Sequence, residues 1–406
     1  MSKTEELGPW KLGQDNVHDR YDGVFRTSRG QQARLAEAIN VDMDDDGWPQ
    51  KRDGTADVLT VTSPRALVSC AGLLLLQNGG GIYRVTPGAS PGDAASAEAL
   101  VTGLDTDAVV QFHEFGGKCY WTNGIESGLI LPDGTATNWG LAVPPSPTLG
   151  AGAGTLPSAK YRVACTLADA RGVESGAPQA AEITTSGGIT VDLSSVDANA
   201  QYVDIYAARG NMPKLYWAKR VAVGSLPTTV DDVRVSDRTL RNEFLRGPIP
   251  GNCLFSYIGY MMIGRDNFVF RSRGQVPHLF HPKSEIMTFA DDVRAGAGLR
   301  DGFYVATTGG LHWISGSEPA KWGKVIKDHN NYARCVLKLP GEFVDFADTD
   351  DEVALFGGDK GLVLAASGGR VSYITDNRLD VSDGKVSGSI VYREVGGIAQ
   401  IVMLLN

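Results

Sequence analysis

The sequence predicts an all-β protein, organised as a β-propeller of about five to seven blades with one inserted β-sandwich. The main observation is a recurring pattern of an apolar strand, a glycine-containing turn and a second apolar strand, found at residues 73–85, 117–124, 260–270, 303–313 and 353–364. Asn-Gly and Gly-Gly supply the positive φ angles of tight hairpin turns, and a hairpin repeated roughly every 35–50 residues is typical of propeller blades. Glycine is also abundant, at 50 of 406 residues, and long helical patterns are nearly absent.

Residues 1–142 are predicted to hold an entry segment and the first blades. Within the entry segment we expect a hairpin, with strands at 38–43 and 48–54 on either side of an Asp-rich turn. The best helical candidate of the chain is the short stretch at 31–38. Residues 61–142 then contain two blade-like units.

Residues 143–250 have a different composition and are predicted to form an inserted domain. The stretch 143–154 is rich in Pro, Gly and Ala, a composition that disfavours a regular strand ladder and indicates a linker. Short strands are then expected at 160–167, 188–193, 202–209 and 215–223. Several short strands in one compact stretch indicate a small β-sandwich.

Residues 251–406 are predicted to contain the remaining blades. The chain closes with a hairpin that pairs 388–393 with 399–405. A propeller leaves strand edges open unless its last blade closes onto its first. We therefore hypothesise that the N-terminal segment pairs with this terminal hairpin.

The net charge of −9 argues against tight nucleic-acid binding, which depends on neutralising phosphates with Lys and Arg. A negative net charge is compatible with a surface along which nucleic acid passes without binding. The N-terminus is polar rather than a secretory signal, and the aliphatic run at 73–76 is far short of the roughly 20 residues needed to span a bilayer. We expect a chain without a membrane span, made in a cytoplasm.

The five cysteines, Cys70, Cys119, Cys165, Cys253 and Cys335, are odd in number and widely spaced. No C-x-x-C pair occurs, so neither a zinc site nor a disulfide framework is expected. The sequence predicts five buried thiols.

One weak metal candidate lies in the Asp-rich turn. Asp42, Asp44 and Asp46, followed by Gly47, copy the first half of a calcium-binding EF-hand loop. Position twelve would be Asp53 instead of the usual Glu, and no helix pattern follows. An ordinary Asp-rich hairpin turn is the favoured interpretation, and no cofactor is predicted.

No catalytic constellation emerges, and the chain is predicted not to be an enzyme. His278 and His281 are favoured as packed or solvated rather than metal ligands, and the acids at 291–292 and 348–352 as solvated turns. The glycine-rich stretches at 150–154 and 295–298 are expected to be loops.

Three aromatic segments could make contacts. Residues 268–274 could bind an extended nucleic acid, but alternation places its aromatics on one side and its arginines on the other, which favours an ordinary blade strand. Tyr216-Trp217 and Trp322-Gly323 are either exposed contact loops or buried packing, and the sequence does not separate the two.

The segment at 38–42, followed by Lys51-Arg52-Asp53-Gly54, resembles the opening of a family of tailed-bacteriophage virion proteins. Members of that family begin with an alanine-x-asparagine-valine-aspartate strand, a glycine turn, here Gly47, and an arginine-x-glycine return. Their architecture, a propeller with an inserted fibronectin-like or immunoglobulin-like domain, is also similar to the one predicted here. Residues 161–165, 172–175 and 202–206 resemble strands and a loop of such inserts.

The resemblance implies a structural protein of the phage tail, located in the virion and assembling as a homo-oligomer with other virion proteins. One hypothesis places it at the head–tail junction or nozzle, next to portal or adaptor proteins. The alternative is a tail-tip or baseplate protein that contacts the host surface. A third hypothesis, a glycan-cleaving propeller enzyme, has no sequence feature in its favour.

Overall fold

The structure is a computed structural model of the 406-residue chain. It describes residues 58–90, 92–316, 318–344, 351–375, 387–395 and 398–405, together with four short strands between residues 24 and 51. The described part is all-β, with many small antiparallel sheets, and its only helical turns are four short 3-10 segments: η1 (Val223–Ser225), η2 (Pro319–Lys321), η3 (Gly341–Phe343) and η4 (Ser367–Gly369).

Two short hairpins lie near the N-terminus. β1 (Val24–Thr27) pairs with β2 (Gly30–Ala33), and β3 (Val41–Met43) pairs with β4 (Pro49–Lys51). The second confirms the predicted entry hairpin. The helical prediction at 31–38 is wrong for its first residues, because they pair with a strand rich in β-formers; the rest of that stretch lies outside the described residues.

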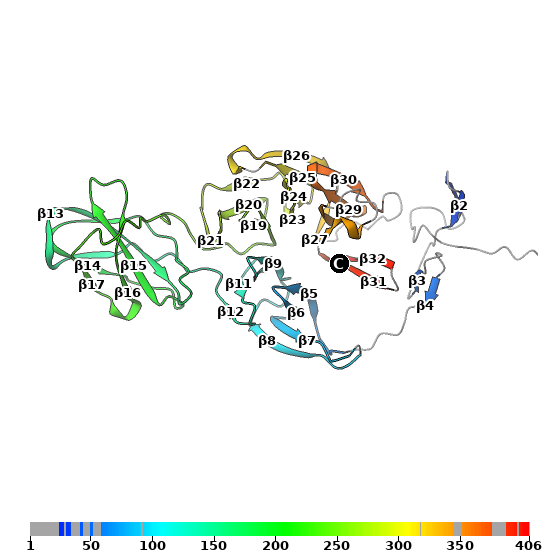
Figure 1. Cartoon of the computed structure of the whole chain (residues 1–406), viewed down its shortest axis with the longest axis horizontal. Helices are drawn as coiled ribbons and strands as arrows, with labels where there is room; N and C mark the ends of the chain where they lie inside the picture. The colour runs from blue at the N-terminus through cyan, green and yellow to red at the C-terminus, as the bar shows by residue number, and fades with distance from the viewer. Residues whose placement is uncertain are drawn as a thin grey trace, which may run out of the picture. The chain divides into compact units, whose positions relative to one another are not determined.

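The chain divides into two compact units: residues 67–84 with 99–288, and residues 1–66 with 85–98 and 289–406. This division differs from the predicted boundaries at 142 and 250, which stay predictions. Four sheets are four-stranded, with consecutive strands as neighbours, and two further sheets have five strands (Figure 1).

Two such sheets precede the insert, and they confirm the two units predicted within 61–142. The first contains β5 (Pro64–Cys70), β6 (Leu73–Asn78), β7 (Gly81–Thr86) and β8 (Ser96–Thr102). The second contains β9 (Gln111–Phe115), β10 (Lys118–Thr122), β11 (Ser127–Ile130) and β12 (Ala136–Thr137).

The third sheet follows the insert. Its strands are β18 (Cys253–Tyr257), β19 (Tyr260–Arg265), β20 (Phe268–Arg273), β21 (Val276–Phe280) and β22 (Ile286–Thr288), with β21 and β22 pairing with different parts of β20. Pro277 lies inside β21. This is tolerated because β21 is an edge strand, where a missing N–H breaks no central ladder.

The other unit holds two further sheets. One contains β23 (Val293–Gly298), β24 (Gly302–Thr307), β25 (Gly310–Ser315) and β26 (Gly323–Asp328); the other contains β27 (Tyr332–Pro340), β28 (Glu352–Gly358), β29 (Gly361–Ala366) and β30 (Arg370–Tyr373). β24 is buried along its whole length, as is β29. Central strands are covered on both faces and therefore appear in the sequence as continuous apolar runs. These runs are the most recognisable part of the repeated pattern.

The prediction that 295–298 is a loop is wrong, because these residues form most of the buried strand β23. β23 lies against β27, and the absence of large side chains lets the two backbones approach. The terminal hairpin is confirmed: β31 (Gly388–Val395) pairs with β32 (Ile398–Leu405), and Ile390 joins the core of the β27–β30 sheet. Its closure by the N-terminal segment stays a prediction.

The insert forms one five-stranded sheet around its own core. Its strands are β13 (Thr148–Ala168), β14 (Ala181–Asp192), β15 (Tyr202–Arg209), β16 (Tyr216–Ala222) and β17 (Thr228–Val230), in the order β16-β15-β13-β14-β17. The pairing of β13 with β14 shifts register after Gly152 and Leu156. The sheet curls, and Lys219 Nζ on one edge donates hydrogen bonds to Thr228 Oγ1 and the Thr229 carbonyl on the other, both at 3.0 Å.

The linker prediction for 143–154 is wrong over its second half. Residues 148–152 pair with 188–192 and form the start of β13. The strand bends just after residue 152. A side chain at Gly152 would press on Thr229 and Thr190, so a small residue is needed there. The loop prediction for 150–154 is wrong for the same reason.

A disulfide joins Cys70 on β5 to Cys119 on β10, with the two Cα atoms 5.6 Å apart. The prediction of five free thiols is therefore wrong for this pair, and Cys165, Cys253 and Cys335 are buried free thiols. The bond was not expected from the sequence because its cysteines are 49 positions apart. That separation corresponds to about one repeat of the sheet pattern, which brings the two strands together.

We expect reduction of this disulfide to lower the free energy of unfolding by up to about 4 kcal/mol, because a closed loop of this length restricts the unfolded chain. The measurement is urea denaturation with and without dithiothreitol. The Cys119→Ser variant is the control, since it should be as unstable as the reduced protein and insensitive to dithiothreitol. Equal midpoints for the oxidised and reduced wild type would contradict the prediction.

Candidate interaction surface

The insert carries a polar network on the face of β15 that points away from its apolar core. Val203 and Ile205 face the core, so alternation turns Asp204 to the other side. Asp204 is fully buried and accepts hydrogen bonds from Trp217 Nε1 at 2.8 Å and from Arg220. The Arg220 contact is bidentate, at 2.9 Å from Nε and 2.6 Å from Nη2. Bidentate pairing is the geometry that best compensates a buried carboxylate.

A second carboxylate, Glu174, ties three segments together. Its Oε1 accepts hydrogen bonds from Tyr206 Oη at 2.8 Å and Thr166 Oγ1 at 2.5 Å, and its Oε2 accepts one from Arg238 Nη2 at 2.7 Å. Burial, followed by the Glu174 carboxylate, raises the pKa of Tyr206 well above its usual range. Tyr206 is therefore a fixed donor, and the network holds the segment returning from the insert against the sheet.

The arginines of this network lie over tyrosine rings. The guanidinium carbons of Arg220, Arg238 and Arg234 are 5.5, 5.5 and 4.7 Å from the ring centroids of Tyr202, Tyr206 and Tyr216. Their side chains are 40%, 44% and 53% exposed, respectively. Stacking and ion pairing order these long side chains in advance, which lowers the entropy cost of a contact with another molecule. We call these six residues the arginine–tyrosine face.

The insert is joined to its unit around a buried tryptophan. Trp139 is 2% exposed, and its Nε1 donates a hydrogen bond to the Pro277 carbonyl at 3.0 Å. Its ring lies 5.0 Å from Tyr120 and 6.3 Å from Phe280, centroid to centroid. Because these partners come from the β9–β12 and β18–β22 sheets, Trp139 connects both sheets at the point where the insert leaves the chain.

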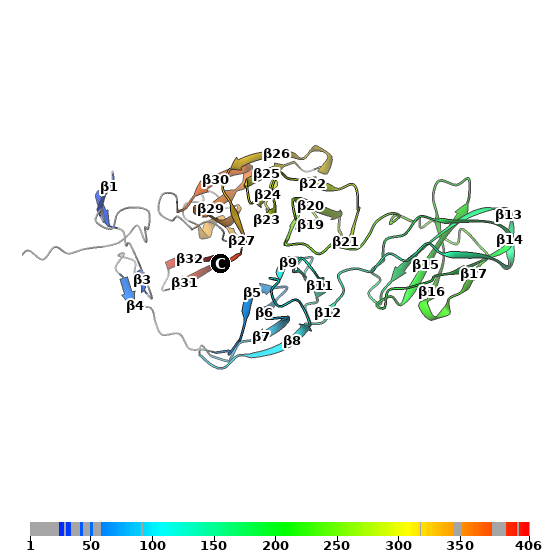
Figure 2. The same ribbon diagram turned by 180° about the vertical axis from the view of Figure 1, so that it is seen from behind.

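Two chain segments connect the insert to the sheets and lie side by side (Figures 1 and 2). A Cβ on Gly140 would lie 3.2 Å from Pro248 Cδ and from the His278 carbonyl oxygen. The outgoing segment is fixed by Asp197, whose Oδ2 accepts a 2.8 Å hydrogen bond from the Ala142 N–H. The returning segment passes so close to Gly176 that a Cβ there would lie 1.8 Å from the Leu245 carbonyl oxygen. Only glycine fits at that crossing.

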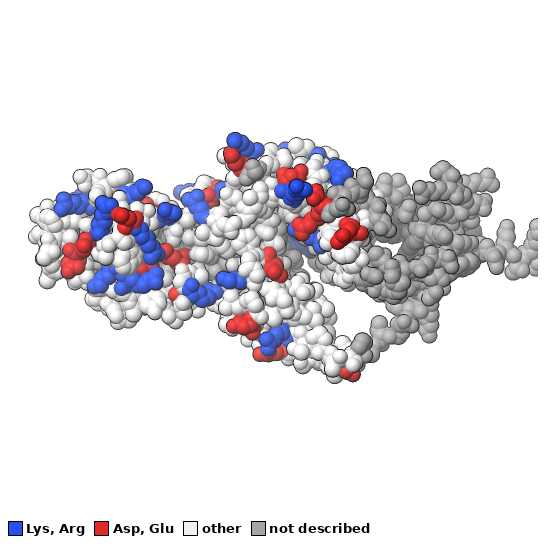
Figure 3. Space-filling view, viewed as in Figure 1, with Lys and Arg blue, Asp and Glu red and all other residues white. Residues whose placement is uncertain are grey.

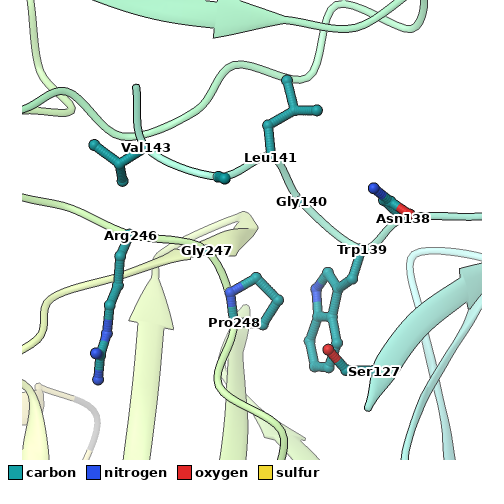
Figure 4. Close-up of a pocket in the computed structure, with 10 residues that line it drawn as sticks. Ser127, Asn138, Trp139, Gly140, Leu141, Val143, Arg246, Gly247 and Pro248 are labelled. Atoms are coloured by element: carbon teal, nitrogen blue, oxygen red, sulfur yellow. The ribbon is translucent and has the colours of Figure 1, made fainter. Parts of the chain in front are cut away.

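A cavity of about 420 Å³ lies between these two segments (Figure 4). Its walls come from both of them, with Trp139, Leu141 and Val143 on the outgoing side and Gly247 and Pro248 on the returning side. In the close-up, Leu141 points away from Trp139. The cavity is therefore the space left where two strands of chain cross.

His278 lies at the same junction. Burial lowers its pKa to about 4, an effect only partly offset by a hydrogen bond with the Glu174 backbone and by the nearby Asp169. It is neutral at ordinary pH. His281, by contrast, terminates a turn, because its Nδ1 accepts the backbone N–H groups of Lys283 and Ser284 at 3.2 and 2.9 Å. The structure uses the two histidines for packing and turn formation, as favoured from the sequence.

The other predicted candidates are separate from this surface. Asp42 lies in β3, and Asp44 and Asp46 lie outside the described residues, as do residues 348–350. Among the described residues, no group of three or more His, Cys, Asp or Glu side chains is arranged to hold a metal ion. Asp351 pairs with Arg300 at 3.1 Å, and Glu352 pairs with Lys338 at 2.8 Å.

The segment at 268–274 alternates as predicted. Arg271 and Arg273 both reach the Glu285 carboxylate, at 3.4 and 3.0 Å, while the rings of Phe268 and Phe270 lie 6.1 Å apart. Tyr216 and Trp217 are half-buried parts of the arginine-rich network. Trp322 is half-buried, with its ring 5.0 Å from that of Phe303.

Sequence reasoning missed the acids and arginines that organise the insert. One local signal was present: Asp204 stands between apolar neighbours in a strand, where an inward charge requires a partner. Its partners Arg220 and Arg238 follow 16 and 34 positions later, and no local pattern connects them. Trp139 was hidden in the same way, since Pro277 and Phe280 come from beyond the insert.

Comparison with known proteins gives no assignment of the chain to a family. No family model matches the chain, and no curated protein matches it. Similar solved structures include a protein from Lactobacillus plantarum (13% identity, TM-score 0.34, covering 79% of this chain and 86% of that one). Others are Hsv2 of Kluyveromyces lactis (7%, 0.30, 84% and 90%) and Sqt1 of Saccharomyces cerevisiae (11%, 0.23, 77% and 98%). TM-scores below 0.5 do not establish a common fold, and none of the three is named as a phage protein.

We expect Asp204→Ala to lower the free energy of unfolding by about 2–3 kcal/mol, because it leaves Trp217 Nε1 and Arg220 without their acceptor. The matched control is Asp237→Ala, which removes the exposed ion pair with Arg234 and should cost less than about 1 kcal/mol. Urea denaturation followed by circular dichroism measures both. Equal losses would contradict a special role for the buried carboxylate.

Stability should also depend on pH through His278. Its pKa is lowered in the folded protein, so the unfolded chain takes up the proton first, and stability is lost as pH falls from about 6.5. The loss should approach about 3 kcal/mol near pH 4. Unfolding free energies at several pH values should fall more steeply in this range for the wild type than for His278→Gln. Parallel curves would show that His278 is not responsible.

Proposed function

We propose that this chain is a structural protein of a bacteriophage tail, acting at the head–tail junction or nozzle. In this proposal the small antiparallel sheets outside the insert are the blades of a β-propeller, and residues 143–250 form a fibronectin-like domain, whose one curled sheet takes the place of a sandwich's two, inserted between the second and third blades. The protein is made in the host cytoplasm, has no catalytic role, and assembles with copies of itself and with other virion proteins.

The observation that carries the proposal is the hairpin of β3 and β4. It places Val41 opposite Lys51 and Met43 opposite Pro49, within the segment that resembles the opening of the phage family. The insertion of one separately packed domain between two meander sheets supports the same proposal. Among the described residues, no helix has the length and apolarity of a membrane span.

Two chemical features are compatible with a virion. The Cys70–Cys119 disulfide can persist after particles leave the reducing cytoplasm, since virion surfaces are oxidising environments. The net charge of −9 would let DNA pass without binding. A purified protein that bound DNA tightly at moderate salt would count against the junction role.

The deciding experiment is immunogold labelling of intact virions with antibody against this chain. Gold at the neck or at the stub below the capsid is the expected result. If gold is absent, dissociated particles are labelled and their proteins identified by mass spectrometry. Absence of the chain from purified particles would refute the proposal.

A second candidate role, host contact at the tail tip, is favoured by the half-exposed arginine–tyrosine face. Ordered arginine and tyrosine side chains are common in recognition surfaces. Gold at the distal end of the tail, together with binding of purified protein to host cells, would support this role. Loss of cell binding in Arg234→Ala, which removes only an exposed ion pair with Asp237 and should leave folding unchanged, would locate it on this face.

A further inference from the structure

Three cationic side chains of the insert form a row across β15, β16 and the segment that returns to the sheets. Ala207 pairs with Tyr216, and Tyr216 in turn pairs with Thr239, so these three residues lie side by side on one face. Two positions further along each segment comes a cationic residue, and alternation returns all three side chains to that same face. We call these residues the cation row: Arg209, Lys214 and Arg241.

Backbone hydrogen bonds fix the register of the row. The Leu240 N–H donates to the Leu215 carbonyl at 2.9 Å, and the Trp217 N–H donates to the Arg238 carbonyl at 2.8 Å. Paired strands lie about 4.8 Å apart, so the three cationic side chains start from positions spaced at roughly that interval. The turn at 210–213, which joins β15 to β16, contains no acidic residue.

The positive charge of the row is not compensated. All three side chains are exposed, and none of them forms an ion pair among the described residues. By contrast, the three arginines of the arginine–tyrosine face all pair with acids, and Lys160 beside the turn pairs with Glu182 at 2.6 Å. Like charges opposite each other in a sheet are destabilising, so the row carries a repulsion that the paired cations avoid. Figure 3, with the insert on the left, shows Lys and Arg side chains over much of its visible face.

The spacing and the residue types of the row indicate the chemistry of a ligand. Cationic groups that start about 5 Å apart can donate together to one tetrahedral oxyanion. A phosphate group carries up to about two negative charges and three acceptor oxygens, so it can offset two of the three cations, whereas a carboxylate offsets one. Two members of the row are arginines, whose planar fork matches phosphate oxygens.

The row offers charge without a surface for stacking. Tyr216, the aromatic residue next to it, is covered by Arg234, whose guanidinium carbon lies 4.7 Å from the ring centroid. Sites that bind single-stranded nucleic acid add aromatic stacking platforms to their positive charge. We therefore expect the row to recognise a phosphate group rather than the molecule that carries it.

We propose that the cation row is a binding site for phosphate groups. Because its three cations are exposed, its affinity should be modest and should fall as salt is raised. The proposal goes beyond the tail role and does not depend on it, since the row belongs to the insert wherever the chain resides.

The test uses the full-length chain and inorganic tripolyphosphate at low ionic strength, with isothermal titration calorimetry as the measurement. The wild type should bind tripolyphosphate, and Arg209→Gln/Lys214→Gln should weaken binding at least about tenfold. Without phosphate, the same variant should unfold at a higher urea concentration than the wild type, because it removes repulsion within the row. A merely structural role of the two side chains would lower the urea midpoint.

The matched control is Arg265→Gln/Lys283→Gln, which removes one arginine and one lysine from exposed positions of the β18–β22 sheet and its loops. It should change tripolyphosphate binding by less than about twofold. Circular dichroism confirms that both variants fold. No binding by the wild type, equal losses in the two variants, or equally tight binding of citrate, a tricarboxylate, would each overturn the inference.

Two further probes identify the source of the phosphate. Binding to phosphatidylglycerol vesicles but not to neutral phosphatidylcholine vesicles, lost in the row variant, would assign a lipid headgroup. Binding of a single-stranded thymidine oligonucleotide, lost in the same variant, would assign a nucleic-acid backbone. Binding of tripolyphosphate alone would assign a free phosphate compound.

Discussion

The packing of Trp139 is the constraint on which the branched architecture depends. Its indole lies in one apolar cluster with Tyr120 and Leu129 of one sheet and with Met261 and Phe280 of the next. These two sheets are separated in sequence by the whole insert, so their contact has to be made by side chains rather than by a short turn. The hydrogen bond from Trp139 Nε1 to the Pro277 carbonyl fixes the orientation of the indole, which burial of its apolar surface alone would not fix.

Beyond this cluster, two kinds of interaction hold the insert together. Its interior is apolar, whereas the segment that returns to the sheets is held by Glu174, Asp204 and their arginines. A buried carboxylate without a hydrogen-bonding partner destabilises the folded state. Glu174 and Asp204 therefore favour the conformations of the returning segment that keep their arginine partners in place. The ordered arginines and tyrosines on the surface of the insert are a consequence of that fixation.

The sequence predicted the elements well where the pattern is local, and poorly where it is not. Four of the five repeated strand–turn–strand phrases and the ends of β15 were found because central strands are continuously apolar and their turns carry glycine; the phrase at 117–124 holds only the single strand β10. Small-residue strands such as β23 were taken for loops, since glycine and alanine lack β-propensity and are explained only by the close approach of β27. The disulfide and the buried carboxylates depend on residues far apart in sequence, which no local pattern connects.

The side-by-side connection of the insert has a mechanical consequence. Any load on the insert reaches the sheets through two neighbouring strands of chain, one ending on the sheet that contains β12 and one on the sheet that contains β18. The two backbone hydrogen bonds between Arg246 and Phe280, both at 2.9 Å, lie beside the Trp139 contact. A load on the insert would strain both bonds at the same time. The insert is thus attached to the sheets through two adjacent segments and one buried aromatic cluster, so the load passes into two sheets at a single point.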